Sequence, residues 1–237
     1  MAGKIGDIGS ILRANDYPGR GIITGKSVDG KKAVFAYFIM GRSENSQNRI
    51  FVEKGRDLFI RPFDESRVKD PSLIIYSPVR VAGERIIVTN GDQTDTIYDF
   101  LAGGRSFEEA LDTRCFEPDE PNFTPRVSAL LDFRSGFAYK LSILKAADAA
   151  GAACNRFTFS YTPISGTGHF IHTYAGNGNP IPSFAGEPEV IEVGNDIDEY
   201  TRRIWDNLSE DYRVSLYVRF IDIGSGSHES RMINKNS

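Results

Sequence analysis

Four short segments of the sequence concentrate polar side chains of the kinds that bind anions. They are YPGRG at residues 17–21, MGRSENSQNR at 40–49, TNGDQTD at 89–95 and EPDEPNFTPR at 117–126. Each lies beside a segment with strand character, so we expect their arginines, amides and carboxylates at strand ends. Guanidinium groups bind phosphates and oxyanions through paired hydrogen bonds, and a carboxylate inside a ligand-filled pocket can carry a proton. This combination favours a pocket for a small phosphorylated ligand.

Taken singly, the same residues have ordinary structural interpretations. Asn90-Gly91 is typical of a tight turn, and Asp92 is typical of a helix N-cap. An isolated arginine is usually a surface residue, and Glu117 is solvated unless something buries it. By its own composition, the segment at 40–49 favours a solvated turn between two strands. Only the joint occurrence of the four segments favours a site.

Other site chemistries find no matching pattern in the sequence. His169 and His172 are three residues apart in a strand pattern, so they point to opposite faces and cannot hold one metal ion together. Cys154 lies in a run of small residues that indicates packing rather than an activated thiol. The sequence has neither a Gly-x-Ser-x-Gly nucleophile elbow nor a Walker-type phosphate loop. We therefore expect no metal site and no covalent nucleophile.

Composition is that of an ordinary globular protein. The chain has 237 residues, 40% hydrophobic residues and a formal net charge of -4, which argues against a duplex nucleic-acid binder. With only Cys115 and Cys154 there is no disulfide framework, and a reducing cytoplasm fits best. The start of the chain has no signal sequence, and no segment reaches the ~20 apolar residues of a membrane span. We expect a cytoplasmic protein without a membrane partner.

Alternation of apolar and polar residues predicts strands over most of the chain. The segments at 155–163 and 212–222 alternate strongly enough to predict one buried face each, and RVSALLDF with FAYKLSILKA predicts a hairpin. The other expected strands are GIITGK, KAVFAYFIM, SLIIYS, ERIIVTN and GHFIHTYA. Helical spacing predicts helices within DQTDTIYDFLAG, RSFEEALDT and NDIDEYTRRIWDNL. Because the strands follow one another without regular helices between them, the class is α+β with largely antiparallel sheets.

The order of the polar segments resembles the archaeal-type IMP cyclohydrolases and their bacterial relatives. The resemblance covers residues 17–220 and also rests on LIIYSPV and GTGHFIHTYAGNGNPIPSFAGEP. It implies a four-layer αββα sandwich of two mainly antiparallel sheets, similar to the N-terminal-nucleophile hydrolases but without a processed N-terminal nucleophile. The leader and the loops at 57–70 and 115–122 look longer than in archaeal members. We expect one domain over residues 1–223 and a polar, mobile tail at 224–237.

The resemblance also implies a reaction, the last step of purine synthesis. 5-Formamidoimidazole-4-carboxamide ribotide closes to inosine monophosphate (IMP) and loses water. The carboxamide nitrogen attacks the formyl carbon of the same molecule, so the protein must hold the reactive conformer, supply a base, and stabilise and protonate the formyl oxygen. This chemistry requires no metal and no redox cofactor.

On this resemblance, each polar segment contributes to the site. We expect Glu117 to be the proton carrier, with His169 as a second candidate acid. Arg49 is expected to bind the ribotide phosphate or the developing oxyanion, and Tyr76 to donate to the formyl oxygen or line the base. The expected binding residues are Arg20, Arg42, Ser43, Asn48, Asn90, Asp92, Asp95 and Arg126. Two alternatives remain open: a purine-nucleotide-binding module without turnover, and an amidohydrolase on the same fold. The sequence leaves the formation of a homo-oligomer open.

Overall fold

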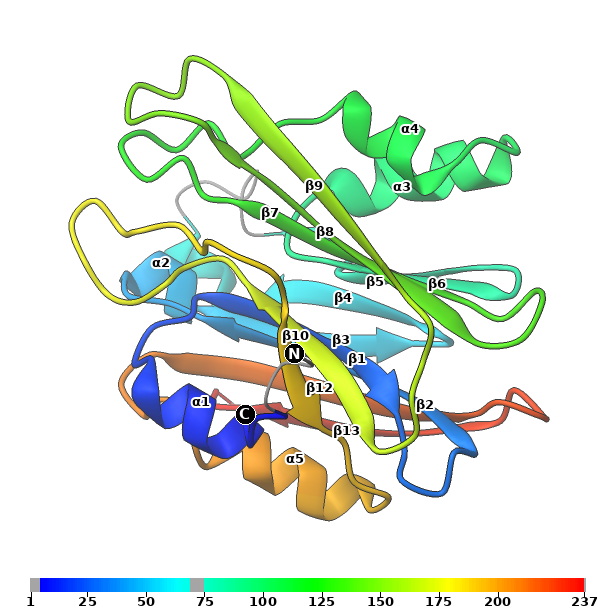
Figure 1. Ribbon diagram of the computed structural model, residues 1–237. Coiled ribbons are helices and arrows are strands. Elements are labelled where there is room, and N and C mark those ends of the chain that lie inside the picture. The colour runs from blue at the N-terminus through cyan, green and yellow to red at the C-terminus, as the bar shows by residue number, and fades with distance from the viewer. Residues whose placement is uncertain (1–4, 69–74, 237) are drawn as a thin grey trace.

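Two antiparallel sheets lie face to face in the computed structural model, which describes residues 5–68 and 75–236 (Figure 1). The first sheet has the order β11-β10-β1-β2-β12-β13. Its strands are β1 Arg20–Lys26, β2 Lys32–Met40, β10 Thr167–His172, β11 Glu189–Glu192, β12 Arg213–Asp222 and β13 His228–Asn234. The second sheet runs in chain order from β3 to β9. Its strands are β3 Arg49–Lys54, β4 Asp57–Pro62, β5 Val79–Ala82, β6 Arg85–Thr89, β7 Arg126–Asp132, β8 Ala138–Ala146 and β9 Cys154–Tyr161.

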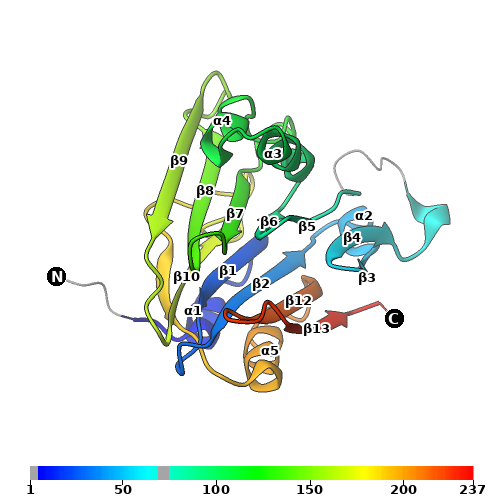
Figure 2. The same ribbon diagram turned by 90° about the vertical axis from the view of Figure 1, so that its right-hand side faces the viewer.

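Helices cover the outer faces of both sheets. On the first sheet, α1 Ile8–Ala14 and α5 Ile197–Trp205 bury their apolar sides, and on the second sheet α3 Gln93–Ala102 and α4 Phe107–Asp112 do the same. Turning the molecule shows α3 and α4 beside the second sheet and α5 next to β12 and β13 (Figure 2). A third apolar cluster fills the space between the sheets. The α+β class and the αββα layering are confirmed, and the similarity to N-terminal-nucleophile hydrolases stays a prediction.

Two helices show the capping and spacing expected from the sequence. Ser106 and Glu109 form the predicted capping box at the start of α4. In α5, Ile197, Tyr200 and Ile204 are buried along one stripe. Leu208 is also buried, but it lies beyond the end of that helix. The remaining short elements, α1, α2 Glu44–Gln47 and the 3-10 turn Glu65–Arg67, lack a pattern long enough to be recognised in the sequence.

Burial differs from the prediction in the two strands expected to have one buried face. Strand β12 is buried on both faces, because α5 covers one side and the second sheet covers the other. Strand β9 is mostly exposed, because it is the edge of its sheet and no helix covers its whole length. Phe157 is 43% exposed, while Phe159 and Tyr161 pack against the core between the sheets. An alternating pattern therefore identified the strands but not their surroundings.

The C-terminal segment contradicts the expectation of a mobile tail. Residues His228–Asn234 form β13, which pairs antiparallel with β12 at the edge of the first sheet. The Asn234 side chain accepts a hydrogen bond from the Phe51 N–H and donates one to the Phe51 carbonyl in β3. The polar composition of this segment therefore reflects its position as an edge strand, one side of which faces solvent.

One expected strand falls partly outside the described residues. Of SLIIYS, residues 72–74 lie outside them, and residues 75–77 belong to no strand. The segment of Tyr76 therefore approaches the sheets as irregular chain. Among the helices that the structure describes, none combines the length and apolar character needed to span a membrane.

A buried charge network joins the two sheets. Arg219 on β12 is 1% exposed and donates to Glu53 of β3 (2.9 Å), to the Tyr217 hydroxyl (2.8 Å) and to the Arg56 carbonyl (2.9 Å). Tyr217 donates to the same Glu53 carboxylate at 2.8 Å. All three Arg219 nitrogens thus have acceptors, as a buried cation requires.

We expect Glu53→Ala to destabilise the protein by about 3 kcal/mol, because it leaves the buried Arg219 guanidinium without its carboxylate. Urea unfolding measures this change. Arg231→Gln is the matched control: it breaks the exposed ion pair with Asp198 and should leave the free energy of unfolding nearly unchanged. Equal effects of the two substitutions would contradict a structural role for the buried pair.

Candidate functional site

The segment YPGRG holds Arg20 at the start of β1. Gly19 has φ 78°, and a Cβ there would lie 2.3 Å from Thr173 Oγ1, so only glycine fits. The Thr173 hydroxyl accepts from the Arg20 N–H and donates to the Pro18 carbonyl, each at 3.1 Å. Tyr17 stacks on Tyr174 with ring centroids 5.8 Å apart. The predicted tight turn is therefore present and is fastened to the end of β10.

Arg49 is one of two fully buried arginines among the described residues, the other being Arg219. Its Nε donates to the Ser46 carbonyl at 2.7 Å and its Nη2 to the Met40 carbonyl at 3.3 Å. Within the described part of the chain its Nη1 has no hydrogen-bond partner and its guanidinium no carboxylate within 4 Å. Burial and the nearby charge of Arg20 both lower the pKa of Arg49. A buried cation in this state is a strong site for an anion.

Tyr76 and Tyr37 meet near the two arginines. Their hydroxyl oxygens are 2.7 Å apart, and both side chains are buried. Burial raises the pKa of Tyr76, while the charges of Arg20 and Arg49 act in the opposite direction. Tyr76 therefore stays protonated at neutral pH and can donate a hydrogen bond.

Glu117 completes this cluster from the loop before β7. It is 3% exposed, and its backbone N–H donates to the Thr124 carbonyl at 2.9 Å. Burial raises the pKa of Glu117, and the charges of Arg20 and Arg126 only partly oppose that effect. Glu117 in turn raises the pKa of Arg20, although burial of the guanidinium lowers it. A carboxylate with a raised pKa among arginines is suited to taking and giving a proton.

The loop that carries Glu117 is anchored on Tyr174. The Thr124 hydroxyl bonds to both the Asp119 carboxylate and the Tyr174 hydroxyl, the latter at 2.6 Å. Asp119 also accepts from the Thr124 N–H at 2.6 Å. Phe123 takes φ 43°, a conformation that costs energy for a residue other than glycine. These contacts hold the loop against the turn that carries Arg20.

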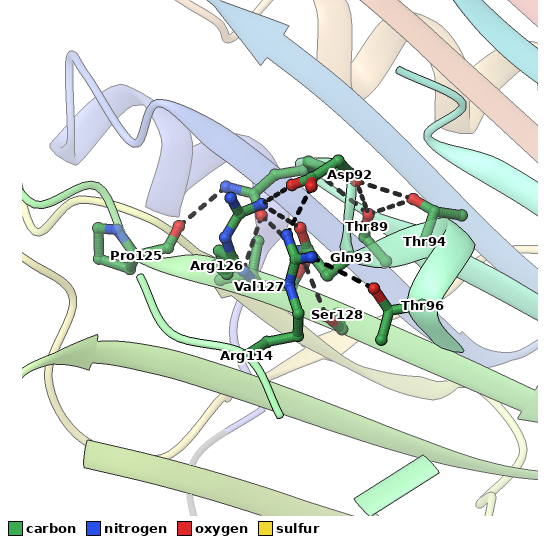
Figure 3. Close-up of polar contacts among 12 residues, drawn as sticks. Thr89, Asp92, Gln93, Thr94, Thr96, Arg114, Pro125, Arg126, Val127 and Ser128 are labelled. Carbon is green, nitrogen blue, oxygen red and sulfur yellow. Dashed lines mark hydrogen bonds and ion pairs between the residues drawn. The ribbon is translucent and has the colours of Figure 1, made fainter. Parts of the chain in front are cut away.

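Asp92 and Arg126 form a second, connected part of the site (Figure 3). The sequence predicts that the Asp92 side chain caps α3. The side chain makes no capping hydrogen bond, because its carboxylate bonds to two guanidinium groups instead. Its Oδ1 lies 2.6 Å from Arg126 Nη1, and its Oδ2 lies 2.6 Å from Arg114 Nη2. Arg126 also donates to Gln93 Oε1 at 2.7 Å, and its buried Nε has no partner among the described residues.

Gly91 brings the two parts together. A Cβ on Gly91 would lie 2.4 Å from Arg126 Nη1 and 3.4 Å from Glu117 Oε1, so these two atoms are within about 6 Å of each other. Arg126 and Glu117 nevertheless form no ion pair within 4 Å in the described structure. A side chain at residue 91 would fill the space between them. The glycine of the Asn90-Gly91 turn therefore has a second role, since it keeps this space open.

Three other predicted site residues form hydrogen bonds with backbone groups of the protein. Asn90 donates to the Pro125 carbonyl and accepts from the Val127 N–H, which fastens the start of β7 to the end of β6. Asn48 makes a pair of hydrogen bonds with the backbone of Asp64. Ser43 caps the short helix α2 through the Ser46 N–H. These side chains are engaged with the protein itself.

Three further predicted residues, Arg42, Asp95 and His169, are bonded to residues outside the cluster. Arg42 donates to the Asn177 side chain and the Gly178 carbonyl, with its guanidinium 5.4 Å from the Tyr17 ring centroid. Asp95 forms an exposed ion pair with Arg80 at 2.7 Å. The segment at 40–49 is thus divided: a short capped helix at the surface, then the buried Arg49.

His169 lies far along the first sheet from Arg20. It pairs with Thr24, four residues along β1 from Arg20, or about 13 Å. Its Nδ1 bonds to the Tyr139 hydroxyl at 2.7 Å and its ring stacks on Tyr161. Burial lowers the pKa of His169 to about 4, which disfavours the imidazolium form that would act as the acid. The geometry does not support His169 as an acid for this site.

Sequence reasoning missed Tyr37, Arg114 and Tyr174. Tyr37 lies inside an apolar run and Tyr174 at the end of a strand, so no local signal distinguishes them from core residues. Arg114 belongs to none of the four polar segments, and its role depends on the packing of the chain after α4 against α3. Only the folded arrangement identifies these three.

Comparison with known proteins places the whole site inside one family match. The family described as IMP cyclohydrolase-like protein matches residues 17–226. The IMP cyclohydrolase of Methanopyrus kandleri is 38% identical over 120 residues, which is 49% of this chain and 59% of that protein. That of Methanococcus maripaludis is 34% identical over 127 residues, or 51% of this chain and 61% of its own length. That of Methanothrix thermoacetophila is 30% identical over 123 residues.

The alignments with these relatives cover about three fifths of each relative, whereas the family match covers most of this chain. The family match contains the turn of Arg20, the buried Arg49, the loop of Glu117 and the Asp92–Arg126 pair. By this match, the chain belongs to the IMP cyclohydrolase-like protein family.

Proposed function

We propose that this protein closes 5-formamidoimidazole-4-carboxamide ribotide to IMP with loss of water. The observation that carries the proposal is a cluster of three arginines around the buried carboxyl of Glu117: Arg20, Arg49 and Arg126 each have a buried nitrogen without a hydrogen-bond partner among the described residues. A ribotide has an anionic phosphate and a flat base with several acceptor atoms, and these satisfy the donors. The names of the relatives, IMP cyclohydrolases, agree with this assignment.

Arg20 and Arg49 supply positive charge for the phosphate and for the oxygen that becomes negative. Their orphaned nitrogens, Nε of Arg20 and Nη1 of Arg49, are buried, so hydrogen bonds from them act in a medium of low dielectric constant. The Tyr76 hydroxyl, kept protonated, donates to the formyl oxygen. The same cluster of Arg20, Arg49 and Tyr76 therefore both binds the ribotide and stabilises the negative charge that develops on the formyl oxygen.

Glu117 moves the proton. As a carboxylate it takes a proton from the carboxamide nitrogen while that nitrogen forms its bond to the formyl carbon. As an acid it returns that proton to the formyl oxygen, which becomes the hydroxyl group of the tetrahedral intermediate. A second proton passes by way of Glu117 from the formamido nitrogen to this hydroxyl as the C–O bond breaks and the C=N bond forms, so water leaves and Glu117 ends in its starting state. Burial raises the pKa of Glu117, which favours its protonated form more than that of an exposed glutamate and suits a group that both takes and gives a proton. Arg126, close to Glu117 but not bonded to it, balances the charge of the carboxylate form.

The two alternatives make different demands on the chain. A nucleotide-binding module without turnover needs the arginines but not Glu117. An amidohydrolase needs a nucleophile, and burial raises the pKa of Cys154, which disfavours the thiolate. We also propose a cytoplasmic location, since Cys115 and Cys154 are both free thiols and purine synthesis requires no oxidising compartment.

Purified protein given the formamido ribotide should produce IMP, because the site supplies both the charge and the proton carrier that ring closure needs. The ultraviolet absorbance change on ring closure measures the rate, and chromatography identifies the product. A rate equal to that in buffer would remove the enzyme assignment. Binding of IMP without turnover would then select the nucleotide-binding module.

Glu117→Gln should lower kcat by about 10²–10⁴-fold, because the amide cannot exchange a proton. It should change the Kd of IMP much less, since the amide has nearly the shape of the carboxyl group. Glu120→Gln, an exposed position in the same loop, is the matched control and should leave kcat unchanged. Equal losses in turnover and in IMP binding would mean that Glu117 has a binding role only.

Arg49→Met should raise the Kd of IMP by about tenfold or more, because a charge-assisted hydrogen bond to the ligand is lost. Arg49→Lys keeps the charge in case the buried methionine impairs folding, and it should still weaken binding by losing the guanidinium geometry. Arg61→Met, at an exposed position of the neighbouring strand β4, serves as the control. Calorimetric titration with IMP measures all three, and an affinity unchanged by both Arg49 variants would assign Arg49 to structure alone.

A further inference from the structure

Asp92 is shared between two arginines that come from different parts of the chain. Arg126 lies at the start of β7, and Arg114 lies in the chain that follows α4. Figure 3 shows both guanidinium groups reaching the same carboxylate, at 2.6 Å each. Arg114 is fixed further by a hydrogen bond to Thr96 on α3 at 3.3 Å. Asp92 gives up the usual capping role of its position to make these contacts.

Arg114, Asp92 and Arg126 form a row of alternating charge that ends beside Glu117. Arg126 is the member that acts on Glu117, because its Nη1 and Glu117 Oε1 both lie within 3.4 Å of the position that a Cβ on Gly91 would take. Asp92 is bonded to Arg126 and Arg114, whereas no hydrogen bond or ion pair joins Asp92 or Arg114 to Glu117 in the described structure. Their effect on Glu117 therefore depends on how much of the Arg126 charge remains after pairing with Asp92.

Other charged and titratable groups face Glu117 from every side. They are Arg20 from β1, Arg49 from β3, Asp119 from the same loop, and Tyr76 from the chain before β5. Of the three arginines around Glu117, which are Arg20, Arg49 and Arg126, only Arg126 is bonded to a carboxylate within the described structure. The charge of Arg126 is thus the one that a neighbouring residue can weaken or strengthen.

We propose that Arg114 and Asp92 are positioning residues, which hold Arg126 beside Glu117 and set the positive charge that Glu117 experiences. The catalytic meaning of this inference rests on the proposed function, but the charge coupling itself does not need turnover. Removing Arg114 leaves Asp92 to pair with Arg126 alone, so the surroundings of Glu117 become more negative. Removing the charge of Asp92 makes them more positive. The two changes should therefore move the Glu117 pKa in opposite directions.

Titration of the Glu117 carboxyl by ¹³C NMR, in the full chain without ligand, tests the inference. Glu117→Gln assigns the signal by its loss. Asp92→Asn should lower the pKa of Glu117, and Arg114→Gln should raise it. The pair Asp95 and Arg80 provides matched controls, since Asp95 lies on the same helix in an ion pair of 2.7 Å. Asp95→Asn and Arg80→Gln should leave the Glu117 signal unmoved.

Shifts in the same direction, or no shift in either variant, would overturn the proposal and leave Arg114 with a packing role. If Arg114→Gln does not fold, Arg114→Lys replaces it: the charge is kept, so the Glu117 pKa should stay near that of the parent protein while Asp92→Asn still lowers it. A large shift in Arg114→Lys or none in Asp92→Asn would then count against the coupling. Opposite shifts without any ring-closing activity would retain the coupling and reject the proposed function.

Discussion

Burial of positive charge without a matching carboxylate is the constraint on which this site depends. Arg49 has no exposed surface and no ion-pair partner among the described residues, and Arg20 has a buried nitrogen without an acceptor. Such groups destabilise a fold unless other interactions hold them in place. The turn at Gly19, the carbonyls around Arg49 and the loop anchored on Tyr174 provide that support. The two sheets supply a rigid frame from which the arginines cannot withdraw to solvent.

Another buried arginine shows the contrast between support of the fold and preparation for a ligand. Arg219 has acceptors for its whole guanidinium group, and they come from both sheets. The Arg219 guanidinium therefore needs no ligand to satisfy its hydrogen bonds. Arg49 and Arg126, by comparison, each retain a nitrogen without a partner. Incomplete hydrogen bonding, rather than burial alone, distinguishes the candidate site from the structural network.

Much of the architecture follows from local sequence, and much of the site does not. Alternation located most strands, and the Ser106–Glu109 spacing located a helix start. The polar segments pointed to Arg20, Arg49 and Glu117, which the fold brings together. Burial of both faces of β12 and the edge position of β13 depend on which strands become neighbours, and single-strand patterns carry no such information. The distance of His169 from Arg20 likewise depends on strand register, which no single-strand pattern gives.

The position of β12 has a consequence for how the protein is made. Strand β2 is synthesised early, yet its neighbours in the sheet are β1 on one side and β12, residues 213–222, on the other. Contacts between residues so distant in sequence form slowly, because a long loop must close first. The β1–β2 hairpin that carries Arg20 therefore emerges from the ribosome with an open apolar edge. A nascent chain stalled before β12 would expose that edge to aggregation and to chaperones.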